Sequence, residues 1–136
     1  MKAIICRKTG FNAAHRLHVQ EWDSSTNSKV FGKCNNPNFH GHNYTLEVKL
    51  KGEIDPVTGY VFDMKILKTL VEQEILEKFD HKNLNLDTLE FKQLNPTAEN
   101  IAVVIYNMLI VKIESSLELT IILHETENNY VEYNGK

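Results

Sequence analysis

The sequence predicts an α+β domain with the element order ββααββ, in which a four-stranded antiparallel sheet carries two helices on one face. Two stretches, 44–51 and 119–123, alternate apolar with other residues, which is typical of strands that bury one face. Two longer stretches, after Asp63 and after Pro96, carry apolar residues at the three- and four-residue spacing of amphipathic helices. No repeat, low-complexity tract or linker divides the chain, so we expect a single domain over residues 1–136.

The composition is that of an ordinary globular protein, with 42% hydrophobic and 24% charged residues in a chain of 136. A domain of this size buries roughly two thirds of its unfolded surface, so its core needs neither metal nor disulfide. Any metal site is therefore expected to serve chemistry. The net charge of -3, without long charged runs, argues against nucleic acid and anionic membranes as partners.

The chain shows no apolar segment long enough for a secretion signal or a membrane span, so we expect a cytoplasmic protein. Its two cysteines, Cys6 and Cys34, do not form a disulfide framework and are expected to be free thiols.

The elements are predicted in chain order from local patterns. The first strand ends in residues of one parity, Phe11, Ala13, His15 and Leu17, and the polar stretch 21–29 predicts a mobile loop. In the second strand Tyr44, Leu46, Val48 and Leu50 form the buried face, and residues 55–59 form a turn.

Asp63 is predicted to cap the first helix, whose apolar positions are Ile66, Leu67, Leu70, Val71, Ile75, Leu76 and Phe79. The second helix begins near Thr97 and carries apolar residues to Leu109, with Lys112 as a possible extension. Strands over 119–123 and 130–133, joined by a turn at Asn128 and Asn129, complete the sheet.

Four strands and two helices leave two sheet edges and one sheet face uncovered. A small domain tolerates such edges badly, so we expect a homo-oligomer, the alternative being a monomer with charged edges.

The strongest chemical pattern is His40-Gly41-His42. If the second strand extends backward from Tyr44, both imidazoles share its buried parity, and a neighbouring first strand brings His15 to the same place. Three neutral imidazoles with an open fourth position are typical of catalytic zinc. The alternative is a set of hydrogen-bonded structural histidines.

Cys34 has three possible roles. A fourth metal ligand would make the site structural, a thiol beside a cation would act as a base, and a buried thiol would be inert. The spacing does not choose among them.

Glu125 shares the parity of Leu119, Ile121 and Leu123, so it is either a buried acid that requires a donor partner or, if the strand has ended, a solvated turn residue. Asp80 and His81 follow the first helix; the helix dipole accounts for His81, although a carboxylate-oriented histidine also suits proton transfer. Capping and the dipole likewise account for Thr97 and Glu99.

Taken together, these residues resemble the family of 6-pyruvoyltetrahydropterin synthases and the related 6-carboxytetrahydropterin synthases of queuosine biosynthesis. The resemblance runs nearly end to end, through residues 11–17 (FNAAHRL), 30–38 (VFGKCNNPN), 40–44 (HGHNY), 52–59 (GEIDPVTG), 80–84 (DHKNL), 97–100 (TAEN) and 124–126 (HET).

The resemblance implies a tunnelling fold, in which ββααββ subunits form a barrel as a trimer and two trimers stack into a hexamer with shared active sites. It implies Zn²⁺ on His15, His40 and His42, with Cys34 as the catalytic base. Asp80 and His81 look like further proton-handling residues and Glu125 like the pterin anchor. Thr97 and Glu99 match positions near the pterin, but Ala98 stands where a second hydroxyl residue is common.

The implied substrate is 7,8-dihydroneopterin triphosphate. We expect Arg16 and Lys33 to contact the triphosphate because they are positively charged and close in sequence to the site. The five residues between Cys34 and His40 resemble the biopterin-type enzymes, so we expect 6-pyruvoyl-tetrahydropterin as product. The alternatives are 6-carboxytetrahydropterin, released with acetaldehyde, and a non-catalytic zinc or pterin-binding module.

Overall fold

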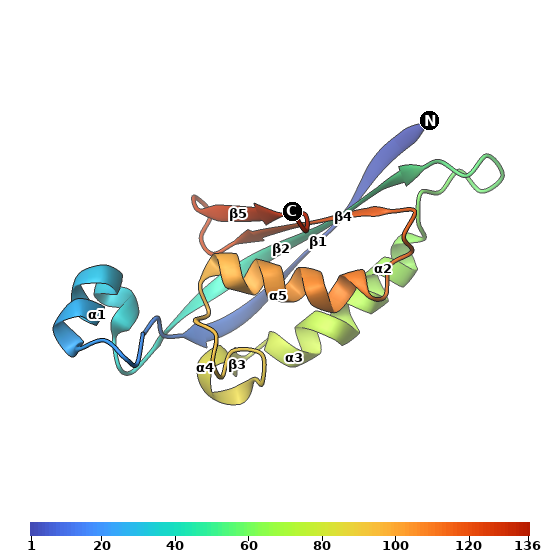
Figure 1. Cartoon of the computed structure of the whole chain (residues 1–136). Helices are drawn as coiled ribbons and strands as arrows, with labels where there is room; N and C mark the ends of the chain where they lie inside the picture. Colours follow the sequence, from blue (N-terminus) through green and yellow to red (C-terminus); the bar gives the residue numbers. More distant parts are fainter.

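The computed structural model describes residues 1–136 and is built on two long strands, β1 (Lys2–His15) and β2 (His40–Glu53). They pair antiparallel over their whole lengths, from Lys2 opposite Glu53 to His15 opposite His40. β4 (Glu118–His124) pairs antiparallel with β2, and β5 (Tyr130–Tyr133) pairs antiparallel with β4. The long β1–β2 pair extends beyond the rest of the sheet, as Figure 1 shows.

The sheet has five strands in the order β3-β1-β2-β4-β5, so the predicted four-stranded antiparallel sheet is wrong in its count. The additional strand, β3 (Lys82–Asn83), pairs in parallel with Ala13 and Ala14 of β1. Two residues are too few to show a period of two, which is why the sequence pattern did not reveal this strand.

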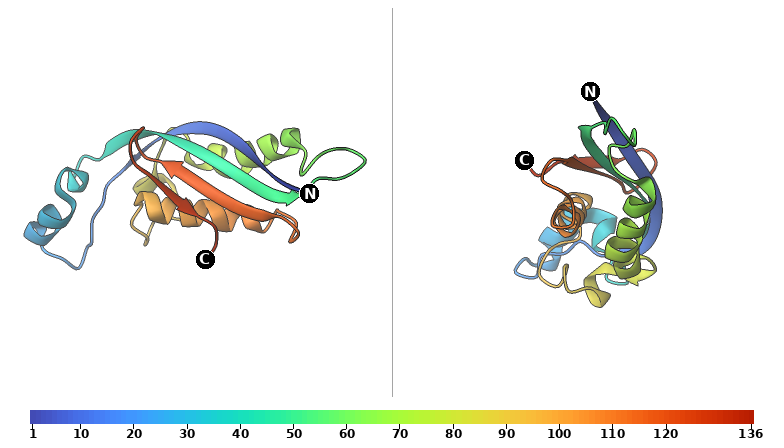
Figure 2. Two further views of the ribbon diagram at one scale, coloured as in Figure 1. Left: turned by 90° about the horizontal axis from the view of Figure 1, so that it is seen from above. Right: turned by 90° about the vertical axis from the view of Figure 1, so that its right-hand side faces the viewer.

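The helices cover one face of the sheet, as predicted (Figure 2). The first helical run consists of α2 (Met64–Val71), a π-helical turn η2 (Glu72–Leu76) and α3 (Glu77–Phe79). The second long helix is α5 (Ala98–Ile110), which ends before the predicted extension to Lys112. A short helix, α4 (Leu84–Asp87), follows β3.

Both predicted helix caps are present. The Asp63 carboxylate accepts a hydrogen bond from the Lys65 N–H (2.8 Å), and the Thr97 hydroxyl accepts one from the Asn100 N–H (3.2 Å). Each bond satisfies a backbone donor that the first helical turn leaves free.

The core lies between the helices and the inward face of the sheet. Leu46, Val48 and Leu50 of β2 and Ile121 and Leu123 of β4 have no exposed surface. The opposite parity of β2 remains partly exposed, so the alternation of residues 44–51 is confirmed. The prediction for Ile66 is wrong: its side chain is 58% exposed and lies outside the core.

Residues 21–29 form structure rather than the predicted mobile loop, because α1 (Ser24–Phe31) begins within them. Asp23 caps this helix by accepting from the Thr26 N–H (2.7 Å), and the buried Asn27 side chain bonds to Val19, Trp22 and Asp23. Local hydrogen bonds therefore order a segment that has little apolar surface. α1 projects from one end of the molecule (Figure 1).

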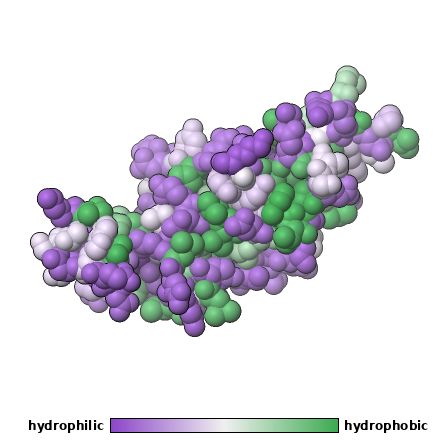
Figure 3. Space-filling model, in the orientation of Figure 1, coloured by the Kyte–Doolittle hydropathy of each residue, from purple (hydrophilic) through white to green (hydrophobic).

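Polar side chains dominate the surface seen in Figure 3, with apolar patches among them over the helices. None of the helices is long and apolar enough to span a membrane.

Candidate active site

Three histidines meet at the end of the β1–β2 pair. His15 and His40 are opposite each other in the register, and His42 follows two residues along β2 on the same inward parity. One nitrogen from each ring lies within 4.8 Å of the other two, and the Nε2 atoms of His15 and His40 are 3.0 Å apart. The predicted convergence of these residues is therefore present in the structure.

Backbone contacts and burial hold the histidines in the form that binds metals. The Nδ1–H of the fully buried His15 donates to the Pro96 carbonyl (2.7 Å), which leaves Nε2 with a free lone pair. Burial lowers the pKa of His15 to about 4, and the hydrogen bond to Pro96 opposes this shift. Burial, and next the neighbouring His42, also lower the pKa of His40. Both rings are neutral at pH 7, as metal ligation requires.

The arrangement fits a tetrahedral metal ion. Two nitrogens on one zinc at about 2.0–2.1 Å lie about 3.3 Å apart, close to the separation of the His15 and His40 Nε2 atoms. In addition, His42 Nε2 is buried without any hydrogen-bond partner. Buried ring nitrogens without partners cost free energy, and a ligand at the centre of the trio would reduce that cost.

Glu125 lies beside the histidines and is partly buried, with its side chain 25% exposed. Its Oε1 atom is 3.8 Å from His42 Nε2, and its backbone N–H donates to the Asn129 carbonyl (3.1 Å) at the start of the turn into β5. The structure lies between the two interpretations of Glu125: β4 ends at His124, so the residue lies in the turn, yet its side chain is only 25% exposed.

Cys34 lies in a short 3-10 turn, η1 (Gly32–Asn35), that links α1 to β2. Gly32 closes α1 with a φ of 56°, a conformation that favours glycine. The Cys34 sulfur is not among the ligand atoms that group within 4.8 Å, so it is a free, half-buried thiol. Burial and the charge of Glu125 raise the pKa of Cys34, which keeps the thiol protonated at neutral pH unless a cation is nearby.

Glu125, Thr97 and Glu99 line one cavity of about 450 Å³ between the start of α5 and the turn into β5. Leu17, Ala98, Asn129, Tyr130 and Val131 complete its lining. The structure thus brings together three of the five residues that are expected to contact the substrate. Two carboxylates in one cavity suit a ligand that presents several N–H donors.

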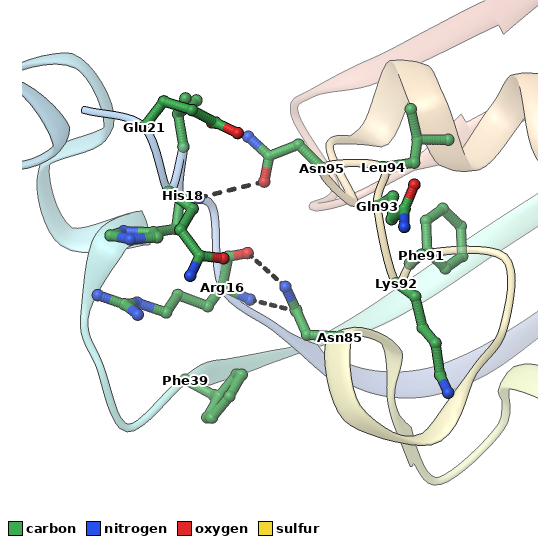
Figure 4. Close-up of a pocket in the computed structure, with 12 residues that line it drawn as sticks. Arg16, His18, Glu21, Phe39, Asn85, Phe91, Lys92, Gln93, Leu94 and Asn95 are labelled. Carbon is green, nitrogen blue, oxygen red and sulfur yellow. Dashed lines mark hydrogen bonds between the residues drawn. The ribbon is translucent and has the colours of Figure 1, made fainter.

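Arg16 lines a different, larger cavity of about 680 Å³, shown in Figure 4. His18, Glu21 and Phe39 lie on the same side as Arg16, and Lys92 and Phe91 lie across from them, with Asn85 between. The Arg16 Nε–H donates to the Asn35 carbonyl (2.9 Å). Lys33 lines neither cavity and is exposed, so the two expected triphosphate contacts do not share a pocket within one chain.

Asp80 and His81 lie beyond the edge of β1, away from the inward face that carries the trio. The Asp80 carboxylate accepts from the Asn12 N–H (2.9 Å) and lies 3.0 Å from His81 Nδ1, while the His81 N–H bonds to the Asn12 carbonyl. These contacts lower the pKa of Asp80, the Asn12 hydrogen bond foremost. His81 is 82% exposed, and no hydrogen bond or ion pair joins the pair to the histidine trio.

The sequence patterns did not reveal several groups that shape the site. They include the Pro96 carbonyl, the Tyr44 hydroxyl at 3.3 Å from His15 Nδ1, and the side chains of Asn27, Asn35, Asn85 and Asn95 around residues 16–19. A backbone carbonyl has no sequence signature, and asparagines read as turn residues. For the Pro96 carbonyl, the sequence indicated only that a proline precedes the second predicted helix.

Comparisons with known proteins agree with this geometry. A family model described as 6-pyruvoyl tetrahydropterin synthase matches residues 4–136. The 6-pyruvoyl tetrahydrobiopterin synthase of Poecilia reticulata is 44% identical over 132 residues, which cover 97% of this chain and 90% of the relative. A 6-carboxy-5,6,7,8-tetrahydropterin synthase of Rickettsia conorii is 28% identical over 144 residues, covering 93% of this chain and 96% of that protein.

The fold is shared as well. The structure of Caenorhabditis elegans 6-pyruvoyl tetrahydropterin synthase matches with a TM-score of 0.94 and 38% sequence identity, covering 100% of this chain and 97% of that one. The chain belongs to the 6-pyruvoyl tetrahydropterin synthase family.

Proposed function

We propose that the protein is a zinc-dependent lyase that converts 7,8-dihydroneopterin triphosphate to 6-pyruvoyl-tetrahydropterin with elimination of triphosphate. The observation that carries this proposal is the histidine trio beside a cavity that Glu125 lines. The greater similarity to a 6-pyruvoyl synthase, 44% against 28% for a 6-carboxy synthase, supports the pyruvoyl product.

His15, His40 and His42 would hold the zinc ion. When bound, it would supply Lewis-acid polarisation of the substrate's side-chain hydroxyls, which makes their protons and the adjacent C–H protons easier to remove. The hydrogen bond from His15 to Pro96 orients the imidazole and fixes its tautomer, as partners of metal-binding histidines commonly do.

Cys34 takes the role of proton acceptor in this proposal. Burial and Glu125 raise the pKa of Cys34, so its thiolate needs positive charge nearby. The zinc ion proposed on the histidine trio would supply that charge. The Asp80–His81 pair exchanges protons on the opposite side of the substrate's carbon chain, with the Asp80 carboxylate orienting the imidazole.

Glu125 anchors the pterin ring. A carboxylate accepts two parallel hydrogen bonds from an amino-pyrimidine edge, and Thr97 and Glu99 lie in the same cavity. Substrate bound there places its side chain toward His42, which lies 3.8 Å from Glu125. Arg16 and Lys33 are proposed triphosphate contacts.

The site is proposed to be complete only in an oligomer, a hexamer built as a dimer of trimers. Within one chain the exposed His81 has no contact with the trio, and the pair lies at the β3 side of β1, where most of the strand edge is unpaired. An edge of this kind is available for pairing with another copy. Asp80 and His81 of one subunit would then serve the histidine trio of its neighbour.

The decisive experiment is mass spectrometry of the products formed from 7,8-dihydroneopterin triphosphate, with and without a zinc chelator. We expect 6-pyruvoyl-tetrahydropterin and inorganic triphosphate, and loss of both on chelation. Acetaldehyde with 6-carboxytetrahydropterin would establish the alternative product, and pterin binding without turnover would establish a binding module.

A further inference from the structure

The segment 16–19 leaves the sheet directly after His15, and four asparagine side chains supply the hydrogen bonds that a neighbouring strand would otherwise make. The amide of Asn85 bonds to both the N–H and the carbonyl of Arg16 (2.8 and 2.9 Å), as Figure 4 shows. Asn95 accepts from the His18 N–H (3.1 Å). Asn27 bonds to both backbone groups of Val19 (2.8 and 2.9 Å).

The fourth asparagine, Asn35, connects this segment to the turn that carries Cys34. Its side-chain amide donates to the Leu17 carbonyl and to His18 Nδ1, each at 2.8 Å. Its backbone carbonyl accepts from the Arg16 Nε–H (2.9 Å), and the Cys34 carbonyl accepts from the Leu17 N–H (2.8 Å). Hydrogen bonds of both the backbone and the Asn35 side chain thus join residues 34 and 35 to residues 16–18.

The contact between residues 34–35 and 16–18 matters for the candidate site because a site residue precedes each of the two segments. His15 precedes the segment, and Cys34 precedes Asn35. Among the helices and strands, the four-residue turn η1 has its main contacts with α1, which itself projects from the body (Figure 1). The hydrogen bonds of Asn35, together with the bond from the Leu17 N–H to the Cys34 carbonyl, therefore set where the Cys34 thiol lies relative to the histidine trio.

We propose that Asn35 is a positioning residue that holds Cys34 in register with His15, an inference that rests on the proposed role of Cys34 as the base. Asn35 acts by orienting Cys34, because its side chain contacts Leu17 and His18 and makes no hydrogen bond to His40 or His42. Misplacement of a reacting group by about 1 Å costs up to about a hundredfold in rate, so loss of the amide should be visible in kcat.

The test compares Asn35→Ala with Asn107→Ala in a Cys6→Ala background, which leaves Cys34 as the single thiol. Asn107 is an exposed helical asparagine without a side-chain hydrogen bond, so its variant controls for loss of an amide. We expect Asn35→Ala to lower kcat about tenfold or more, with KM and bound zinc within about twofold of the background protein. We also expect Cys34 to react faster with iodoacetamide.

The outcomes distinguish a failure of this inference from a failure of the proposed function. Unchanged kcat together with an unchanged alkylation rate would overturn the inference. Should Asn35→Ala fail to fold, His18→Ala removes one of the two acceptors and leaves the bond to Leu17; a smaller fall in kcat supports the proposal and wild-type kcat refutes it. If the background protein shows no turnover, the proposed function fails, and the alkylation rates still establish whether Asn35 holds the thiol.

Discussion

The Nε2 atoms of His15 and His40 lie 3.0 Å apart, although neither ring is positively charged at neutral pH and His15 already uses its Nδ1–H on Pro96. Two bare ring nitrogens at this distance repel each other unless a proton or a cation lies between them. In the neutral pair a proton on His40 Nε2 can be shared with His15 Nε2, and a metal ion between the rings would take its place, so the trio could hold a metal ion.

Zinc is expected to stabilise the folded protein through this pair. At a free concentration of about 100 times Kd, binding to the native state adds about 2.7 kcal/mol to the free energy of unfolding. Thermal melts with zinc and with chelator measure the effect. Replacing one ligand, as in His42→Ala, should abolish most of the difference; a zinc-induced rise in Tm as large as that of the wild type would contradict the ligand assignment.

The Cys34→Ala substitution separates a base from a ligand. Because the sulfur lies outside the group of three nitrogens, we expect the variant to retain zinc and its fold while turnover is lost. Metal analysis, circular dichroism and the product assay give the three readouts. A variant that loses its zinc would instead identify Cys34 as a fourth ligand.

For Glu125 the expected defect is in substrate binding. Glu125→Gln replaces one acceptor oxygen by a donor, so one of the two hydrogen bonds to a pterin is lost, at about 1.5–3 kcal/mol or roughly 10–100-fold in affinity. Isothermal titration with a non-reactive pterin measures the change, and zinc content should stay the same. Equal pterin affinity in the two proteins would rule out Glu125 as the anchor.

Mixed oligomers test whether Asp80 and His81 act across a subunit boundary. Cys34→Ala and His81→Ala are each expected to be inactive, yet co-refolding them should restore activity, since some sites then combine intact Cys34 with intact His81. About a quarter of the sites would be complete under random mixing with one neighbour contributing to each site. A mixture as inactive as its parents would place both residues in the same subunit's site.

Acid sensitivity is expected from the outer face of the sheet, where the Glu47 carboxylate lies 2.8 Å from His124 Nε2. This hydrogen bond is the main reason that the pKa of Glu47 lies below its usual value. A depressed carboxyl pKa stabilises the fold above the unfolded pKa of about 4.5, and this stabilisation is lost as the pH falls through the lower, folded value.

The matched variant is Glu47→Gln, which keeps the shape and removes the titration. We expect the variant to be about 1 kcal/mol less stable at pH 7, because the pair is partly exposed to solvent, and the difference should shrink below pH 4. Urea unfolding between pH 3 and pH 7 measures it. A difference that does not change with pH would show that Glu47 contributes through packing alone.

The sequence by itself determined the family, the order of the four longer strands and the two long helical runs, and the three histidines that converge. Strand alternation from Tyr44 extends unbroken to His40 and His42, so the shared parity of these two histidines follows from local geometry. The helix starts were equally local, because Asp63 and Thr97 act on N–H groups two or three residues away.

Only the tertiary structure decided the features that depend on distant partners. The strand β3 exists because the chain after His81 meets Ala13 and Ala14 of β1. The tautomer of His15 depends on a carbonyl 81 residues away, and the place of Cys34 depends on Asn35 and Leu17. Such contacts satisfy polar groups across long loops, and no periodicity in the sequence encodes them.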